Sequence, residues 1–133
     1  MLVSEDHGIS WKPVSNGLPA VPCTWVTIDP ESPKNYRTLY AAMYEEGIYK
    51  SVDHGANWVK KSQGLGNTGN MHVLQVEIHP QTGDLFASIT AHREGSQFPV
   101  PGGLWKSTNG GESWIDLTGS LDLRWATYFA LHP

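Results

Sequence analysis

The chain has a single cysteine, Cys23, among its 133 residues, so no disulfide bond can form within it. No apolar run is long enough to cross a membrane as a helix, and the first residues lack a basic segment followed by an apolar one, so neither a transmembrane segment nor a signal peptide is visible. The formal net charge is −4, with acidic and basic residues mixed along the chain. This charge argues against nucleic acid and against an anionic membrane as partners. The compartment stays undetermined.

Helical periodicity is equally scarce, because apolar residues do not recur at i, i+3, i+4 and i+7 over any long stretch. The chain contains 14 Gly and 9 Pro, which bound short runs of alternating apolar and polar residues. Runs of this kind, separated by turn residues, are typical of β-strands. The sequence therefore predicts an all-β domain.

One eight-residue pattern, Ser-x-(Asp/Asn)-x-Gly-x-x-Trp, occurs three times. Its copies are residues 4–11, 51–58 and 107–114, which we call box 1, box 2 and box 3. Their starting points are 47 residues apart (51 minus 4) and 56 residues apart (107 minus 51). Spacing of this size indicates repeated supersecondary units.

The residue types in each box predict a hairpin turn. The Asp or Asn side chain can accept hydrogen bonds from backbone N–H groups just ahead of it, and the Gly supplies a positive φ. The Trp then anchors the next strand as a large apolar side chain. We therefore assign a structural role to the box residues Ser4, Asp6, Gly8, Trp11, Ser51, Asp53, Gly55, Trp58, Ser107, Asn109, Gly111 and Trp114.

The three boxes resemble the Asp-box, the BNR repeat of sialidases, xyloglucan-degrading glycosidases and sortilin-type receptors. This resemblance implies a β-propeller in which each box joins the third and fourth strands of a four-stranded antiparallel blade. It also implies that the boxes lie away from the binding face, so that their Asp and Asn side chains are not catalytic.

The strand signals repeat in step with the boxes and predict one partial propeller domain over residues 1–133. We expect a half blade at 1–14, complete blades at 24–60 and 72–117, and the first strand of a further blade at 124–133. Because propellers usually close with at least four blades, two alternatives stay open. Either the chain is a piece of a longer propeller, or copies of it associate to complete one.

Two lengthened loops are predicted on the face opposite the boxes. Leu85 lies 22 residues before Ser107, whereas Leu39 lies 12 before Ser51, so the loop at 91–102 is ten residues longer than its counterpart. The loop at 64–72 is longer by three, since Trp58 to Pro80 is 22 residues and Trp11 to Pro30 is 19. Long loops on a rigid scaffold commonly carry binding residues.

The candidate ligand-binding residues follow from this placement. Four belong to the lengthened loops, namely His72, His92, Arg93 and Glu94, although an exposed Arg–Glu pair and surface histidines are the structural alternative. Glu77 is expected on an innermost strand, where a carboxylate needs a partner. Trp25 and Trp125 are candidates to stack on a sugar ring. No metal site and no cofactor is predicted.

The sequence holds only three arginines, Arg37, Arg93 and Arg124, and Arg37 falls on the box face, so the arginine cluster of sialidases is not available within one chain. The interpretation favours a non-catalytic interaction or carbohydrate-binding propeller module, with carbohydrate or protein as its partner. In one version of this interpretation, copies of the chain associate to complete the propeller. The alternative is a fragment of an Asp-box glycoside hydrolase whose catalytic carboxylates lie partly outside this chain.

Overall fold

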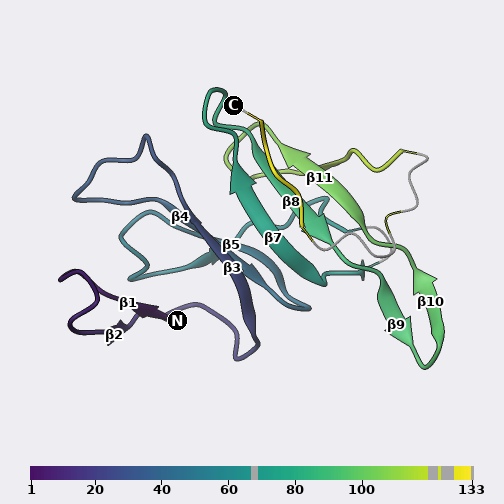
Figure 1. Ribbon diagram of the computed structural model, residues 1–133, viewed down its shortest axis with the longest axis horizontal. Coiled ribbons are helices and arrows are strands. Elements are labelled where there is room, and N and C mark those ends of the chain that lie inside the picture. The colour runs from purple at the N-terminus through teal and green to yellow at the C-terminus, as the bar shows by residue number, and fades with distance from the viewer. Residues whose placement is uncertain (67–68, 120–122, 124–127, 133) are drawn as a thin grey trace.

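The computed structural model describes residues 1–66, 69–119, 123 and 128–132, and its regular elements there are twelve β-strands. Eight of the strands form two four-stranded antiparallel sheets (Figure 1). The first sheet contains β3 (Cys23–Ile28), β4 (Leu39–Met43), β5 (Gly47–Ser51) and β6 (Val59–Lys60). The second contains β7 (Val73–Ile78), β8 (Leu85–Ile89), β11 (Gly103–Ser107) and β12 (Ile115–Asp116). The prediction of all-β, four-stranded antiparallel units is confirmed.

The two sheets repeat the same details of pairing. In each sheet the strands are hydrogen-bonded in chain order, and the first strand pairs with the second through a shifted register. The shift lies between Cys23 and Trp25 in β3, and between Val73 and Gln75 in β7. Because an irregularity of this kind bends a strand, its recurrence at equivalent positions is a further feature that the two sheets share.

The N-terminal residues pack against the first sheet, and the C-terminal residues bind to β7 of the second sheet. β1 (Leu2–Val3) pairs with β2 (Lys12–Pro13) across box 1. The C-terminal residues 128–132 run along β7 without forming a strand, and the remainder of the predicted strand at 124–133 lies outside the described residues (Figure 1). The Gln75 side chain holds this segment by donating to the Phe129 carbonyl at 3.1 Å and accepting from its N–H at 2.9 Å. The described part of this segment is therefore attached to β7 by a side chain.

The main core lies between the two sheets. Its buried side chains come from both sheets and from the loop between them, and include Ile48, Leu65, Val73, Val76, Leu85, Ile89, Trp105 and Trp114. A second cluster, built from Leu39, Ala41, Met43, Tyr49 and Trp58, lies where Met1, Leu18 and Val21 pack against the first sheet. Full burial of each large apolar side chain contributes about 1.5–3 kcal/mol. Both clusters thus join successive units of the repeat.

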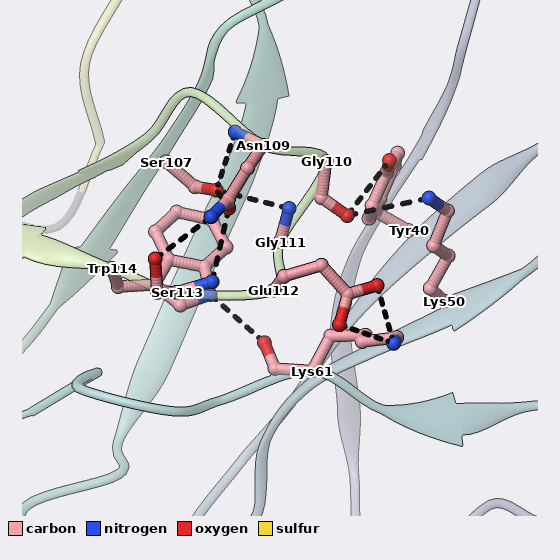
Figure 2. Close-up of polar contacts among 10 residues, drawn as sticks. All are labelled: Tyr40, Lys50, Lys61, Ser107, Asn109, Gly110, Gly111, Glu112, Ser113 and Trp114. Carbon is pink, nitrogen blue, oxygen red and sulfur yellow. Dashed lines mark hydrogen bonds and ion pairs between the residues drawn. The ribbon is translucent and has the colours of Figure 1, made fainter.

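The three boxes share one hydrogen-bond pattern. In each, the Ser hydroxyl accepts from the N–H of the box Gly at 2.7, 2.8 and 2.9 Å in chain order. The same hydroxyl donates to the Asp or Asn side chain, whose oxygen also accepts a backbone N–H four residues further on. Figure 2 shows this pattern in box 3. The Ser10 hydroxyl and N–H are the main causes that lower the pKa of Asp6 to about 2.

The backbone of every box passes through the left-handed region twice. The fourth position has φ of 58° at His7, 59° at His54 and 68° at Gly110, and the Gly that follows has φ of 87°, 86° and 89°. A side chain is strained in this region whereas Gly is not. The boxes are therefore tight turns made by local bonds, as the residue types predict.

The lengthened segment at 91–102 forms a hairpin where the sequence predicts only a loop. β9 (His92–Glu94) pairs with β10 (Gln97–Val100), and the hairpin extends beyond the end of the second sheet (Figure 1). It connects β8 to β11, whereas box 3 connects β11 to β12. Because these strands are antiparallel, the two connections lie at opposite ends of the sheet.

Candidate functional site

A pocket of about 490 Å³ lies at the end of the sheets opposite the boxes. Three segments surround it: the turn between β4 and β5, the residues just before β7, and the β9–β10 hairpin. The lining residues are Glu45, Gly69, Asn70, Met71, His72, His92, Glu94 and Val100. The pocket therefore lies between two successive sheets, and both lengthened segments contribute to it.

Asn70 fixes the segment before β7 to the base of the hairpin. Its side-chain amide donates to the Thr90 carbonyl at 2.9 Å and to the Pro101 carbonyl at 3.3 Å, and its oxygen accepts from the backbone N–H of His72 at 3.2 Å. Asn70 is itself buried. Since the amide bonds both ends of the hairpin, it sets the position of the hairpin relative to His72.

His72 and His92 form a pair across the pocket. The Nδ1 atom of His92 lies 3.4 Å from the Nε2 atom of His72, with the ring centroids 4.8 Å apart. On its other side His72 stacks on Tyr44, with ring centroids 4.7 Å apart and planes inclined by 6°. An isolated β-bridge between Tyr44 and His72 places the two rings side by side.

The environment of His72 favours its neutral form. Burial is the main cause that lowers its pKa, and the charge of His92 adds to the effect, while Glu45 partly opposes it. Its Nδ1 atom is buried and has no hydrogen-bond partner within the described residues. A hydrogen bond between the two rings requires an N–H on one facing nitrogen and a lone pair on the other.

Two carboxylates approach the histidine pair: Glu45 at the same His72 nitrogen that faces His92, and Glu94 at the second nitrogen of His92. A Glu45 oxygen lies 3.7 Å from Nε2 of His72, and a Glu94 oxygen lies 3.5 Å from Nε2 of His92. Both carboxylates are exposed, and Glu45 has a left-handed φ of 68° in its turn. We call Glu45, His72, His92 and Glu94 the His–Glu cluster. Among the described residues no group of three His, Cys, Asp or Glu side chains is arranged to hold a metal ion.

The other predicted site residues lie outside this pocket. Arg93 is not among the lining residues, and its Nε donates to the Gly95 carbonyl at 2.6 Å, which stabilises the hairpin turn. Glu77 accepts from the Trp25 indole at 3.0 Å and from the Thr27 hydroxyl at 3.3 Å, so the partner that its carboxylate requires comes from the neighbouring sheet. Trp125 lies outside the described residues.

Trp25 and Glu77 line a second hollow of about 470 Å³ beside the C-terminal segment. The Trp25 ring packs against Tyr128, with centroids 5.9 Å apart and planes inclined by 46°. Its indole N–H is used on Glu77, and one side of its ring is used on Tyr128. These contacts give Trp25 and Glu77 a structural part in joining β3, β7 and residues 128–132.

Sequence reasoning does not select Glu45 and Asn70, which line the pocket, or Tyr44, which stacks on His72. Loop parity does predict that the turn holding Glu45 lies on the face opposite the boxes. Loop parity predicts the face on which a loop lies, but it does not predict which other loops lie next to it. The turn after β4 meets the segment before β7 only because the two sheets pack side by side.

No family model and no characterised protein matches the chain by sequence. Its structure is similar to the crystal structure of the GH74 xyloglucanase from Xanthomonas campestris, with a TM-score of 0.61 and 18% sequence identity. The similarity covers 88% of this chain and 19% of the xyloglucanase chain. The fold is therefore of the β-propeller type, and the chain spans about a fifth of the length of that neighbour.

Proposed function

We propose that this chain is part of a non-catalytic β-propeller module that binds carbohydrate at the His–Glu cluster. The observation that carries the proposal is the gathering of four hydrogen-bonding side chains in one open pocket, namely Glu45, His72, His92 and Glu94. Sugar hydroxyls both donate and accept, carboxylates accept, and neutral imidazoles do one of each. A pocket with a few convergent polar groups is the usual form of a small-ligand site.

The charge of the pocket favours neutral sugars over acidic ones. Glu45 and Glu94 are the acidic residues of its lining, and the lowered pKa of His72 favours the uncharged form of that ring. A sugar carboxylate would meet like charges without an arginine in the pocket lining to offset them. The ligand class that fits is a neutral oligosaccharide.

The three boxes and the propeller-type fold support the same proposal. Their shared turn geometry is what the Asp-box resemblance implies, and the similar solved structure is that of a xyloglucanase. We therefore infer membership of the Asp-box propellers, with the boxes as structural turns and the opposite face as the binding face.

Titration calorimetry with xyloglucan oligosaccharides, and with a sialoside as the acidic comparison, tests the proposal. We expect the neutral sugars to bind and the double variant His92→Ala, Glu94→Gln to weaken binding by about tenfold or more, as the loss of one good hydrogen bond does. The matched control is Glu31→Gln, an exposed carboxylate outside the pocket. Binding that the double variant leaves unchanged, or a preference for the sialoside, would contradict the proposal. A glycan array without hits would instead favour a protein partner.

The second candidate is a fragment of a glycoside hydrolase, favoured by the fold similarity to a xyloglucanase over 88% of the chain. Such enzymes need an acid and a base or nucleophile at a defined separation. Glu45 and Glu94 are the carboxylates of the pocket. In this alternative, one of them is a catalytic group, and its catalytic partner belongs to a part of the enzyme outside this chain. Release of reducing ends from xyloglucan, abolished by Glu94→Gln or Glu45→Gln, would favour the enzyme over the binding module.

A further inference from the structure

We propose that copies of this chain associate head to tail, with box 1 of one copy docked on the β8–β11–β12 edge of a second copy. This proposal does not depend on the carbohydrate site. It rests on a contact that the chain makes twice within itself, and on an equivalent donor in box 1 and an equivalent acceptor at Leu117, neither of which makes this contact within the described residues.

The contact is an indole bond from each box to the unit before it. The Trp58 indole N–H donates to the Val14 carbonyl at 3.2 Å, and the Trp114 indole N–H donates to the Lys61 carbonyl at 2.8 Å (Figure 2). Both rings are only 4% exposed. Box 2 thus packs on the N-terminal strand pair, and box 3 packs on the first sheet.

Box 1 has the same residues and no preceding unit among the described residues. The Trp11 side chain is 60% exposed, and its indole N–H donates to the Gly8 carbonyl of its own box at 3.2 Å. Ile9 and Leu2 beside it are 85% and 60% exposed. An apolar cluster of this kind around an unburied Trp is typical of an interaction surface.

The other half of the contact is present on the second sheet. Val14, Lys61 and Leu117 are equivalent, because each donates its backbone N–H to the carbonyl of the residue three positions before the box Ser of its unit, at 3.1, 2.7 and 2.8 Å. Val14 and Lys61 each accept an indole N–H from the next box. Leu117 is the corresponding acceptor for Trp11 of a second copy.

A lysine that reaches the incoming box is also duplicated. Lys50 lies over the Tyr40 ring at 5.4 Å and donates to the Gly110 carbonyl of box 3 at 3.3 Å (Figure 2). Lys106 lies over the Phe86 ring, also at 5.4 Å, and pairs with Asp84 at 2.7 Å. In the docked arrangement, its equivalence to Lys50 brings it beside His7, the residue of box 1 that is equivalent to Gly110.

The side chains at the junction match as well. Where box 3 meets the first sheet, Glu112 pairs with Lys61 at 2.7 Å. The equivalent pair in the docked arrangement is Ile9 and Leu117, which are both apolar and are 85% and 40% exposed. The unused ends are thus complementary to each other. A contact between two different surfaces of identical copies closes into a ring or continues as a filament.

Sedimentation equilibrium of the whole chain over a wide concentration range tests this proposal. We expect masses at or above twice the 14.7 kDa of one chain. Ile9→Glu alone and Leu117→Lys alone should each weaken association by about tenfold or more, because each buries an unpaired charge at the junction. The double variant should restore association, since it recreates the Glu112–Lys61 pair.

The control variant is Tyr36→Lys, at an exposed residue of the connection between β3 and β4, which belongs neither to box 1 nor to the β8–β11–β12 edge. All four variants change exposed side chains, and near-ultraviolet circular dichroism checks that each remains folded. A monomer at every concentration would overturn the proposal, as would an oligomer that neither single variant weakens. Failure of carbohydrate binding would leave these results unchanged.

Discussion

Gly64 lies so close to Trp114 that a methyl group on its α-carbon would be 2.6 Å from the Trp114 carbonyl oxygen. The same stretch of chain is tied by a backbone bond, because the Trp114 N–H donates to the Gln63 carbonyl at 2.9 Å. Gly17 and Trp58 repeat the arrangement one unit earlier, with an even closer approach and the Trp58 N–H on the Asn16 carbonyl at 2.9 Å. The turn that leaves each unit is therefore held against the box of the next.

We expect Gly64→Ala to destabilise the fold more than Gly83→Ala. Both glycines have a left-handed φ, at 78° and 71°, so each substitution costs about 1–2 kcal/mol of backbone strain. Only Gly64 has a backbone atom in the way, whereas a methyl group at Gly83 meets nothing within 4 Å. The clash adds about 1–3 kcal/mol to the loss in Gly64→Ala. Urea unfolding followed by tryptophan fluorescence measures both, and equal losses would contradict the proposed close packing.

We expect Trp114→Phe to cost about 1–3 kcal/mol of unfolding free energy, because it keeps most of the ring and removes the indole donor of the buried bond to Lys61. Trp11→Phe is the matched control within the same motif. Its indole bond lies at the surface, so its loss should change the unfolding free energy of the monomer by less than about 0.5 kcal/mol. Urea unfolding at low protein concentration separates the two, and equal effects would argue against the indole bond as the junction between units.

The pKa of Asp53 is lowered chiefly by the Asn57 side-chain amide, with the Asn57 N–H and the Ser51 hydroxyl adding to it. Its pKa in the folded state therefore lies below the unfolded value. The stabilisation is present above about pH 3.9 and is lost as the pH falls through the folded pKa. Acid unfolding of the wild type should show this loss, and Asp53→Asn should remove that part of the pH dependence.

Box 3 supplies the internal precedent for Asp53→Asn, since Asn109 fills the same position with the same oxygen contacts. We expect Asp53→Asn to lose only the bond from the Asn57 amide, and Asp53→Ala to lose about 1–3 kcal/mol of stability with the whole turn network. Thermal unfolding at pH 7 ranks the stability of the wild type and of the two variants. An alanine variant as stable as the asparagine variant would show that the network does not stabilise the turn.

Burial and the charge of His92 lower the pKa of His72 below its ordinary value, while Glu45 acts in the opposite direction. The unfolded chain then binds more protons than the folded chain below about pH 6.5, so the free energy of unfolding should fall as the pH drops from 7 towards 5. His72→Gln should flatten this dependence. His7→Asn is the control, because His7 is outside the pocket and Asn tolerates its left-handed φ. Urea unfolding at a series of pH values measures the slopes, and a slope that His72→Gln leaves unchanged would contradict the assignment.

The hairpin at 91–102 shows where length alone misleads. Ten extra residues at this connection predict a long loop, yet His92 to Glu94 and Gln97 to Val100 pair as strands around a turn at Gly95. The partly buried side chains of Phe98 and Val100 alternate with exposed neighbours there. A strand this short has too few apolar residues for its sequence to differ clearly from that of a loop. Only the packing in the structure shows that it is a strand.

The sequence by itself determined the three turns and the order of the strands. Ser51, Asp53, Gly55 and Trp58 lie within eight residues, and nearly all the bonds that shape the turn join atoms no more than four residues apart. Such bonds follow from residue type and spacing, so they can be predicted without a structure.

Only the tertiary structure decided which loops share a pocket and which indoles are buried. The cluster of Glu45, His72, His92 and Glu94 joins the turn after β4, the residues before β7 and the hairpin after β8. Trp11 and Trp114 have the same motif around them and differ in exposure from 60% to 4%. In both cases the outcome depends on what the neighbouring sheet places alongside, and the packing of one sheet against the next is set by side chains that lie tens of residues away in the chain.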